Sequence, residues 1–478
     1  MYVRKGNSFS KLINATEDER AWLTEYLTFE GERKGMAAAK GMCLFNMWSQ
    51  TYPAGLDAMV AKAASADGIK VDFIDKREKP CLYEDEADLE WLRDYQHKAV
   101  IKVVDHKRGI LSLPTAAGKT EIIVGLTRVL PCFWLALVHR SQLADDIAAR
   151  YELRSPGLVA GRILEGRWDV PDDAQLVAAT FQSLRAALKN KKKPARQKAV
   201  VDLLERAQGL IVDEAHTLPA QTFYDTAMMM KNAYYRVGLS GTPLARHDKK
   251  DQYSLAALGP IIYRVKPKKL IGLGVLAKPT VRMVTCVQGS GRTTWPGVYG
   301  ELVVHSTDRN GIIVRATQNA TKPAFVFVEE TDHGKALSKL LFRLGIQNEF
   351  VWGNHSVDYR KSLIRRMVQG HFDVIVCSKV FNEGIDVPEL RSVVNAGGKK
   401  SVIATLQRLG RGMRIDRDKD GKVREGGDVF EVYDVLDRGN SWLTAHATAR
   451  RDAYLSQQYE TIIEPEPAVQ ALRRRLTK

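Results

Sequence analysis

The 478-residue sequence predicts an α/β protein with two parallel-sheet domains in series behind a small α+β unit. Short apolar runs alternate with helical patterns from residue 97 to about 265, and the alternation restarts at Ala324. Such alternation is typical of βαβ units, whose strands are parallel. Polar motifs follow several of the runs directly, at the strand ends where open parallel sheets bind their ligands. Two sheets with a ligand site at the carboxyl ends of the strands are therefore expected.

The strands of the two sheets are predicted from the apolar runs. Those of the first sheet are 109–113, 132–138, 175–180, 209–213, 235–239 and 261–265. Those of the second sheet are 324–328, 349–352, 372–377, 391–396 and 429–433, after a mixed segment rich in Lys, Gly and Pro. The predicted domains are 90–275 and 305–460, and a basic tail, 461–478, follows them.

Residues 1–82 are predicted to form the small α+β domain. Helices are expected at 16–28 and 54–66, and strands at 42–47 and 70–74. The acidic stretch Tyr83–Asp88 is interpreted as a linker to the next domain. This part of the sequence carries no recognisable catalytic motif.

Composition indicates a cytoplasmic protein without a membrane partner. No run approaches the roughly 18 apolar residues of a membrane span, and no apolar signal core follows Met1–Lys5. The five cysteines are scattered and not at metal-ligand spacing, which favours a reducing compartment without zinc. Most of them are expected to be buried as small apolar residues.

A net charge of +16 favours a polyanionic partner, because Lys and Arg that neutralise phosphates release counterions. Nucleic acid is the obvious candidate. The segment Lys189–Lys198 holds six cations and no acid, and Arg473–Lys478 is also basic. Either segment could equally be a solvated loop or tail.

The most informative motif is Pro-Thr-Ala-Ala-Gly-Lys-Thr, directly after the first predicted strand. A small-residue loop that opens a helix directs backbone N–H groups and the positive helix end at phosphates. The ammonium of Lys119 can reach the β- and γ-phosphates, and the hydroxyl of Thr120 can hold Mg²⁺. The general pattern has Gly where this chain has Leu113. The predicted nucleotide-binding residues are Pro114, Thr115, Ala116, Ala117, Gly118, Lys119 and Thr120.

A second motif, Asp213-Glu214-Ala215-His216, ends the strand predicted at 209–213. Asp213 is expected to hold the same Mg²⁺ through water, and Glu214 to orient or deprotonate the attacking water. The two motifs in this order predict hydrolysis of ATP with Mg²⁺.

Further motifs follow the other predicted strands. They are Leu137–Leu143, Ala179–Leu184, Leu239–Pro243, Cys377–Pro388 and Gln407–Arg414. The set resembles the superfamily 2 helicases and translocases over residues 90–460. Within that superfamily the chain looks most like phage UvsW-type recombination helicases, with XPB-like and RecG-like relatives. Leu92–Gln96, Glu383–Pro388 and, more weakly, Tyr52–Leu56 with Ile69–Asp72 carry this likeness.

The resemblance implies two RecA-like domains and assigns further residues to the ATP site. Gln96 would read the adenine edge. Arg411 and Arg414 would be arginine fingers that reach the γ-phosphate from the second domain, with Gln407 lining the same cleft. Gly384 would allow close backbone approach, and Asp386 would contact the ribose or couple ATP to DNA. Ala116 and Ala117 stand where relatives commonly have glycine and a small residue, which predicts a stiffer loop.

The resemblance also implies residues that couple the ATP site to nucleic acid. Ser240 and Thr242 would link Asp213–His216 to the nucleic-acid channel, with His216 sharing that role. The expected contacts to the sugar-phosphate backbone are His139, Arg140, Thr180, Gln182 and Ser378. Each of these could instead be a helix cap.

The function that the resemblance implies is that of an ATP-dependent DNA helicase or translocase, monomeric on single-stranded, duplex or branched DNA. Branch migration, fork remodelling, recombination or repair would be its setting, in the host cytoplasm if a phage encodes it. The alternatives are an RNA helicase, the motor subunit of a restriction system with its nuclease on another chain, and a non-enzymatic scaffold with a relic ATP site. The small N-terminal domain is expected to engage duplex or branched DNA.

Overall fold

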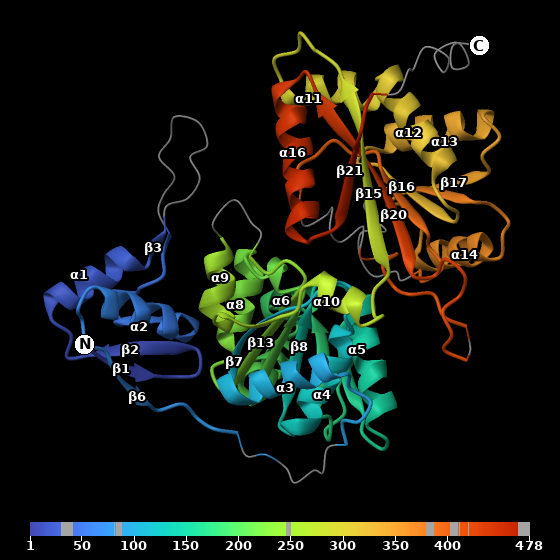
Figure 1. Cartoon of the computed structure of the whole chain (residues 1–478). Helices are drawn as coiled ribbons and strands as arrows, with labels where there is room; N and C mark the ends of the chain where they lie inside the picture. Colours follow the sequence, from blue (N-terminus) through green and yellow to red (C-terminus); the bar gives the residue numbers. More distant parts are fainter. Residues whose placement is uncertain are drawn as a thin grey trace. The chain divides into compact units, whose positions relative to one another are not determined.

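A computed structural model describes residues 1–29, 42–80, 82, 88–244, 250–378, 387–401, 410, 412–418 and 420–466 (Figure 1). The chain divides into two compact units. The first comprises 1–114 and 118–265, and the second comprises 115–117 and 266–478. Each unit is described by itself below.

The N-terminal part of the first unit is a four-stranded sheet with helices packed on one face. The strand order is β5 (Thr51–Pro53), β2 (Phe9–Ile13), β1 (Tyr2–Lys5) and β6 (Asp72–Asp75). Val3 and Leu12 point from the sheet into a core that contains Leu23 and Val60 of helices α1 (Glu17–Tyr26) and α2 (Asp57–Ala66). A 3-10 turn, η1 (Ala54–Leu56), precedes α2, and β3 (Thr28–Phe29) pairs with β4 (Met42–Cys43). The strand expected over 42–47 is therefore wrong beyond Cys43.

The rest of the first unit is an eight-stranded sheet whose neighbours are parallel except at one edge, where β10 runs antiparallel to β9. The order is β10 (Arg167–Asp169), β9 (Ala160–Leu164), β11 (Leu176–Thr180), β8 (Trp134–Val138), β12 (Gly209–Asp213), β13 (Tyr235–Ser240), β7 (Arg108–Ser112) and β14 (Ile261–Arg264). The central strands β8, β11 and β12 are buried along their whole length. Buried apolar runs of this kind are what strands covered on both faces require.

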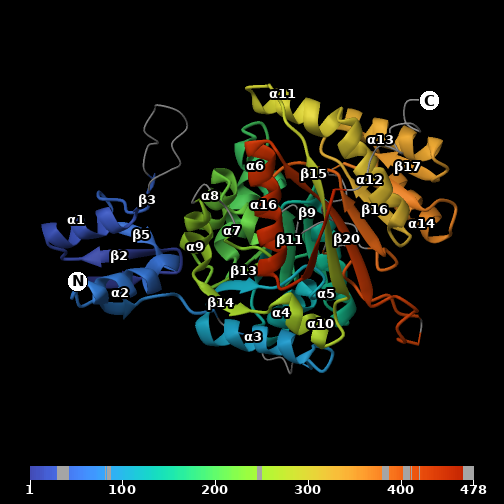
Figure 2. The same cartoon turned by 45° about the horizontal axis from the view of Figure 1, so that its top comes forward.

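Helices cover both faces of this sheet (Figure 2). Those that follow the chain around it are α3 (Asp94–His106), α4 (Lys119–Val129), α5 (Ser141–Arg154), α6 (Phe181–Lys189), α7 (Pro194–Arg206), α8 (Gln221–Met229) and α9 (Asp251–Leu258). Side chains of α6, α7 and α8 share one core with β8, β11 and β12.

The second unit is built on a seven-stranded sheet in which all the paired neighbours are parallel. Its order is β17 (Asn348–Val351), β18 (Val374–Cys377), β16 (Ala324–Phe327), β19 (Ser392–Asn395), β20 (Val429–Arg438), β15 (Lys278–Val287) and β21 (Glu460–Glu464). Among its described residues, the helices and helical turns are α10 (Pro267–Gly272), α11 (Trp295–Tyr299), η3 (Gly300–Val304), α12 (Thr307–Asn319), α13 (Thr331–Arg343), α14 (Val357–Val368) and α16 (Ser441–Ser456).

Alternate residues of β20 show that this sheet too is covered on both faces. Tyr433 and Val435 lie in a core with α12 and α13. Asp434, between them, accepts hydrogen bonds from Arg450 and Tyr454 of α16 on the opposite face. The expected α/β class with two tandem parallel-sheet domains is confirmed.

Two strands of the second sheet were not expected from the sequence. The sheet extends beyond the range 305–460 because β15 lies before it and β21 ends at Glu464. Lys278, Thr280 and Arg282 of β15 alternate with buried residues, so the strand lacks the apolar run by which the others were found.

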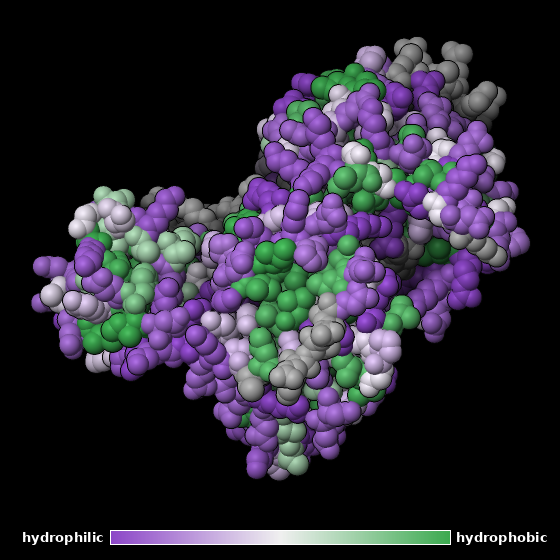
Figure 3. Space-filling view, turned by 60° about the horizontal axis from the view of Figure 1, so that its bottom comes forward, coloured by the Kyte–Doolittle hydropathy of each residue, from purple (hydrophilic) through white to green (hydrophobic). Residues whose placement is uncertain are grey.

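The surface shown in Figure 3 is mostly hydrophilic, and hydrophobic residues gather in separate patches. Over the described ranges, no helix combines the length and apolar character that crossing a membrane requires. Of the four described cysteines, Cys132, Cys286 and Cys377 are buried and Cys43 is exposed.

Candidate nucleotide-hydrolysis site

The predicted motifs of the first unit meet at one edge of its sheet. β12, β13 and β7 are neighbours, with Asp213 paired to Leu239 and Ser240 paired to Ser112. Since parallel strands end at the same edge, the loop after β7 and the residues after β12 and β13 are brought together.

The loop between β7 and α4 has the backbone form of a phosphate cradle. Leu113 N donates to Ser240 O at 3.0 Å, which fixes the start of the loop on the neighbouring strand. Ala116 and Gly118 both have left-handed backbone conformations, with φ of 65° and 73°. Left-handed residues among right-handed ones turn successive N–H groups to one side, where they can bind an anion. Helix α4 then begins at Lys119.

Gln96 lies directly against this loop. Its Nε2 donates to Gly118 O at 3.4 Å, and its Oε1 accepts from Arg93 N at 2.9 Å. The positive φ favours glycine at position 118, and a β-carbon there would come within 2.4 Å of Gln96 Nε2 and displace that amide. The structure thus brings Gln96 to the predicted site, with both ends of its amide already bonded within the chain. Its adenine-reading role stays a prediction.

One lysine stands between two buried carboxylates. Lys119 Nζ lies 2.5 Å from Glu214 Oε1 and 3.9 Å from Asp213 Oδ1. The three side chains are only 11%, 17% and 7% exposed. Burial raises the pKa of Asp213, with Lys119 acting against it. Burial would also raise the pKa of Glu214, but Lys119 and His216 outweigh it and hold that pKa well below its ordinary value.

A chain of contacts leads from these carboxylates to β13. His216 Nδ1 is 3.3 Å from Glu214 Oε2 and 3.1 Å from Ser240 Oγ. Thr242 N donates to Ser240 Oγ at 3.2 Å. Glu214 has a φ of 52°, a conformation that costs free energy for a non-glycine residue and aims its side chain at both Lys119 and His216.

These residues fit a magnesium nucleotide. Mg²⁺ prefers oxygen ligands, and the buried Asp213 offers a carboxylate at the strand end. Thr120, whose hydroxyl is another oxygen donor, is the second residue of α4 and follows Lys119 in the chain. The cradle N–H groups, the lysine and the oxygen donors therefore occupy the same edge of the sheet.

The residues predicted to touch nucleic acid in the first unit lie at the carboxyl ends of β8 and β11. Gln182 Nε2 donates to His139 O at 3.0 Å, which joins the two ends, and Arg140 follows as the residue before α5. Thr180 Oγ1 accepts from Ser183 N at 3.4 Å and so caps α6. The capping alternative therefore holds for Thr180, whose side chain is buried.

In the second unit, Ser378 follows β18, and its N–H donates to Val351 O at 3.0 Å. Arg414 is exposed. The backbone of the preceding residue is held by a hydrogen bond that Ala277 N donates to Met413 O at 2.7 Å. Gly384, Asp386, Gln407 and Arg411 lie outside the described residues, and their assigned roles stay predictions.

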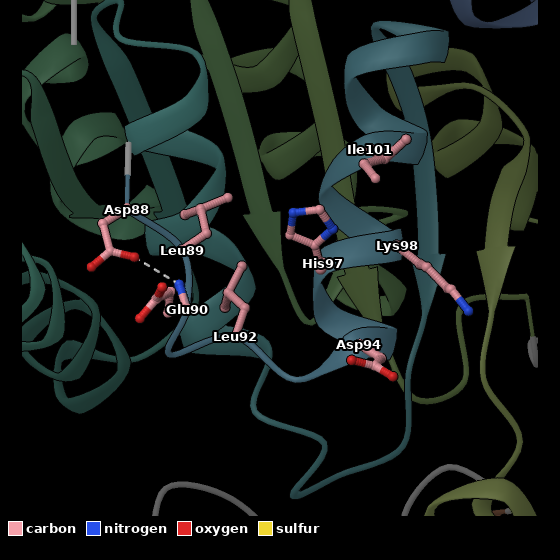
Figure 4. Close-up of a pocket in the computed structure, with 8 residues that line it drawn as sticks. All are labelled: Asp88, Leu89, Glu90, Leu92, Asp94, His97, Lys98 and Ile101. Atoms are coloured by element: carbon pink, nitrogen blue, oxygen red, sulfur yellow. Dashed lines mark hydrogen bonds between the residues drawn. The ribbon is translucent and has the colours of Figure 1, made fainter. Parts of the chain in front are cut away.

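An open pocket of about 620 Å³ beside α3 was not expected (Figure 4). It is lined by Asp88, Leu89, Glu90, Leu92, Asp94, His97, Lys98 and Ile101. Glu90 N donates to Asp88 Oδ1 at 2.8 Å, which shapes the turn at its rim. None of these side chains belongs to the predicted nucleotide site. No sequence pattern indicates this pocket, because it is formed by one face of a helix and a segment that has no regular structure.

The fold and the site together define a P-loop nucleotide-binding protein with two RecA-like domains. The family described as "Type III restriction enzyme, res subunit" matches residues 90–245, and the family described as "Helicase conserved C-terminal domain" matches residues 308–416. The chain belongs to superfamily 2 of the helicases and translocases, as its motif order indicates.

Individual relatives agree with this class. The DNA 3'-5' translocase XPB2 of Sulfurisphaera tokodaii is 25% identical over 383 residues, which cover 70% of this chain and 81% of that protein. The ATP-dependent DNA helicase uvsW of enterobacteria phage T4 is 26% identical over 370 residues, covering 72% and 68%. Three other curated relatives match over about half of their own length. A fragment of an HsdR-type subunit of a type I restriction enzyme from Vibrio vulnificus shares the fold, with a TM-score of 0.58, 15% identity and coverage of 95% of this chain and 98% of that chain.

Proposed function

We propose that this protein is an ATP-dependent motor that translocates along DNA or unwinds it. The observation that carries the proposal is the buried triad at the strand ends, in which Lys119 bridges Asp213 and Glu214 beside a phosphate cradle. Its relatives include proteins named as a DNA translocase and as a DNA helicase. The substrate class is carried over from them.

The triad suggests how Glu214 changes its role during hydrolysis. Without nucleotide, Lys119 holds the pKa of Glu214 low, so this carboxylate is a weak base. A bound ATP supplies the γ-phosphate to which the Lys119 ammonium can turn. Burial then acts on Glu214 with less opposition and raises its pKa, which makes the carboxylate a better acceptor for a proton of the attacking water.

The same exchange of partners can reach nucleic acid. Glu214 is linked through His216 to Ser240 and Thr242, so a change at the carboxylate alters a hydrogen-bonded path at the carboxyl end of β13. We assign this path to coupling between ATP hydrolysis and the strand ends that carry His139, Arg140 and Gln182. Ser378 would serve the same purpose in the second unit.

Completion of the ATP site by the second unit is part of the proposal. Arg411 and Arg414, with Gln407, would stabilise the charge that develops on the γ-phosphate, and Gly384 and Asp386 would face the nucleotide. Mg²⁺ would be held by Thr120 and, through water, by Asp213. The protein would act as a monomer on DNA, in branch migration, fork remodelling, recombination or repair.

An RNA helicase is the second candidate. The chain has the fold of Saccharomyces cerevisiae Dbp5 bound to RNA and ADP BeF3, with a TM-score of 0.53 and 15 to 16% identity. A restriction motor is a third, since the first domain matches a restriction-subunit family. That motor would cleave DNA only when a nuclease chain is added.

The deciding experiment measures ATP hydrolysis with single-stranded DNA, blunt duplex DNA, branched DNA and RNA at matched nucleotide concentration. The Lys119→Ala variant reports any contaminating ATPase. We expect DNA, and branched DNA most strongly, to stimulate the wild-type rate. Stimulation by RNA alone would replace the proposal with the second candidate, and no stimulation by any nucleic acid would favour the scaffold alternative.

A further inference from the structure

The N-terminal part of the molecule lacks the positive charge that the whole chain suggests. Residues 1–80 contain 12 Lys and Arg against 11 Asp and Glu, although the chain as a whole carries +16. Residues 41–56 contain no charged side chain at all. Electrostatic affinity for DNA phosphates comes from counterions that Lys and Arg release. A nearly neutral segment can therefore contribute little of this affinity.

The uncharged stretch instead presents a tryptophan on a rigid turn. Trp48 is 97% exposed. Asn46 pairs with Thr51 through backbone hydrogen bonds of 2.8 and 3.2 Å, and its Oδ1 accepts from the N–H groups of Trp48 and Ser49 at 3.0 Å each. Because these bonds hold the backbone of the turn, little backbone entropy is lost when Trp48 binds a ligand.

An open groove of about 810 Å³ lies beside Trp48. It is lined by Phe9, Thr24, Cys43, Leu44, Phe45, Asn46, Met47, Trp48, Thr51, Pro53 and Tyr224, none of which carries a formal charge at neutral pH. Phe9 and Met47 are 42% and 49% exposed, so the groove offers ring and thioether surface to solvent. Aromatic and thioether surface beside an exposed tryptophan is the kind of surface on which a planar apolar ligand can pack.

The occupant that fits this surface in a DNA motor is an unpaired base. Every base has a π face that stacks on an aromatic ring, and stacking needs no cation. Among the described residues, no carboxylate lines the groove to repel a strand. The exposed Lys11 pairs directly opposite Thr51 between β2 and β5, where it can meet a phosphate. A paired base in a duplex is hidden in its stack and would have to be flipped out at a cost.

We propose that Trp48 stacks on an unpaired base at a single-stranded end or branch point, with the strand lying along the groove. The proposal rests on the proposed function and gives the N-terminal part a definite task within it. That task is to recognise unpaired DNA by contacts that depend little on salt.

Deletion of residues 1–80 is a poor test, because this part is built into the first unit. The fully buried Arg236 donates to Ser8 Oγ, and Arg108 Nη2 donates to Asn7 O at 2.6 Å. A β-carbon at Gly55 would come within 2.2 Å of Leu255 O. Removing the segment would take away one hydrogen-bond acceptor from each of Arg236 and Arg108 and expose the surface packed against it, whereas Trp48 is exposed and can be changed alone.

The experiment compares Trp48→Ala with wild type by fluorescence anisotropy, on a single strand, a fork with unpaired arms and a blunt duplex of equal length. Binding to the single strand and the fork should weaken by about 5- to 150-fold, the worth of one stacked base. Binding to the blunt duplex should change by less than about 2-fold, and the slope of log K against log salt should stay the same on all three. Trp48→Phe should recover most of the loss. Trp442→Ala, which removes a 40% exposed tryptophan of the second unit, is the matched control.

The outcomes separate this inference from the proposed function. Equal affinity of wild type and Trp48→Ala for the fork, with DNA-stimulated hydrolysis intact, overturns the stacking role alone. An equal loss on blunt duplex means backbone contact and also overturns it. If wild type self-associates in sedimentation and Trp48→Ala does not, the groove binds a second copy instead. Failure of wild type to bind any DNA would remove both proposals.

Discussion

Replacing Lys119 by alanine tests the triad through stability as well as activity. The change leaves Asp213 and Glu214 buried without the cation that lies 3.9 and 2.5 Å away. Breaking a buried pair by removing one partner costs about 3–5 kcal/mol, since an uncompensated charge remains. We expect a destabilisation of that order at pH 8, measured as the shift in the denaturant midpoint of the first unit's transition. ATP hydrolysis should be lost while DNA binding remains, because other residues hold the DNA phosphates.

The dependence on pH makes this prediction specific. In wild type the pKa of Glu214 lies below its ordinary 4.5, so its contribution to stability is present above that value and is lost as the pH falls through the folded pKa. Without Lys119, only His216 opposes the effect of burial on the pKa of Glu214, and burial raises the pKa of Asp213 with less opposition, so the carboxyls can relieve their cost by taking up a proton in acid. The deficit of Lys119→Ala should therefore shrink between pH 8 and pH 5. Lys102→Ala, which removes an exposed pair with Asp105, should cost less than about 1 kcal/mol at either pH. A deficit that is absent at pH 8, or equal at both pH values, would refute the role of the triad.

Three other substitutions test neighbouring parts of the site. Arg414→Ala should retain nucleotide affinity but lose about 10³-fold in hydrolysis rate. Arg417→Ala, at another exposed arginine, is the control and should retain the hydrolysis rate. A change in nucleotide affinity alone would count against Arg414 as an arginine finger. Ser240→Ala should lower the ratio of DNA-stimulated to basal hydrolysis by at least about 5-fold, and an unchanged ratio would exclude the path through His216. Gly118→Ala should weaken nucleotide binding in calorimetry, because a φ of 73° is strained for alanine and the new β-carbon would displace Gln96 Nε2 from the loop. Gly157→Ala, with a similar φ of 84° and open space, should bind normally, and equal binding by both variants would remove the cradle argument.

The strands that position the site could be predicted because they are buried on both faces. β12 was expected at 209–213 and is found at Gly209–Asp213, since a fully buried parallel strand must be a continuous apolar run. Asp213 and Glu214 interrupt such a run at its carboxyl end, which is the one place where carboxylates can meet a ligand. The half-exposed β15 gave no such signal, and neither did the short strands β1 and β2 of the N-terminal part.

Contacts between distant segments could not be predicted from local pattern. Gln96 and Gly118 are 22 positions apart, and nothing in either motif indicates that the amide touches the glycine. Nor could the sequence predict that the amide oxygen and the amide nitrogen of Gln96 would both form hydrogen bonds within the chain. The spacing of the motifs predicts which residues lie at the same edge of the sheet. Only the structure shows which of their side chains already form hydrogen bonds within the chain.

Burial also changes what the net charge of +16 can mean for DNA binding. Arg236, Arg309 and Arg450 are completely buried and serve the fold. Arg309 pairs with Asp437 at 2.8 Å and donates to Ala396 O at 2.6 Å, and Arg450 pairs with Asp434 at 2.9 Å. Such arginines release no counterions from DNA, so the phosphate contacts must come from exposed cations such as Lys191–Lys193. Because the N-terminal part is nearly neutral, we expect the salt-dependent part of DNA binding to come from the rest of the chain. In our proposal, the contribution of the N-terminal part is the stacking of the exposed Trp48 on an unpaired base.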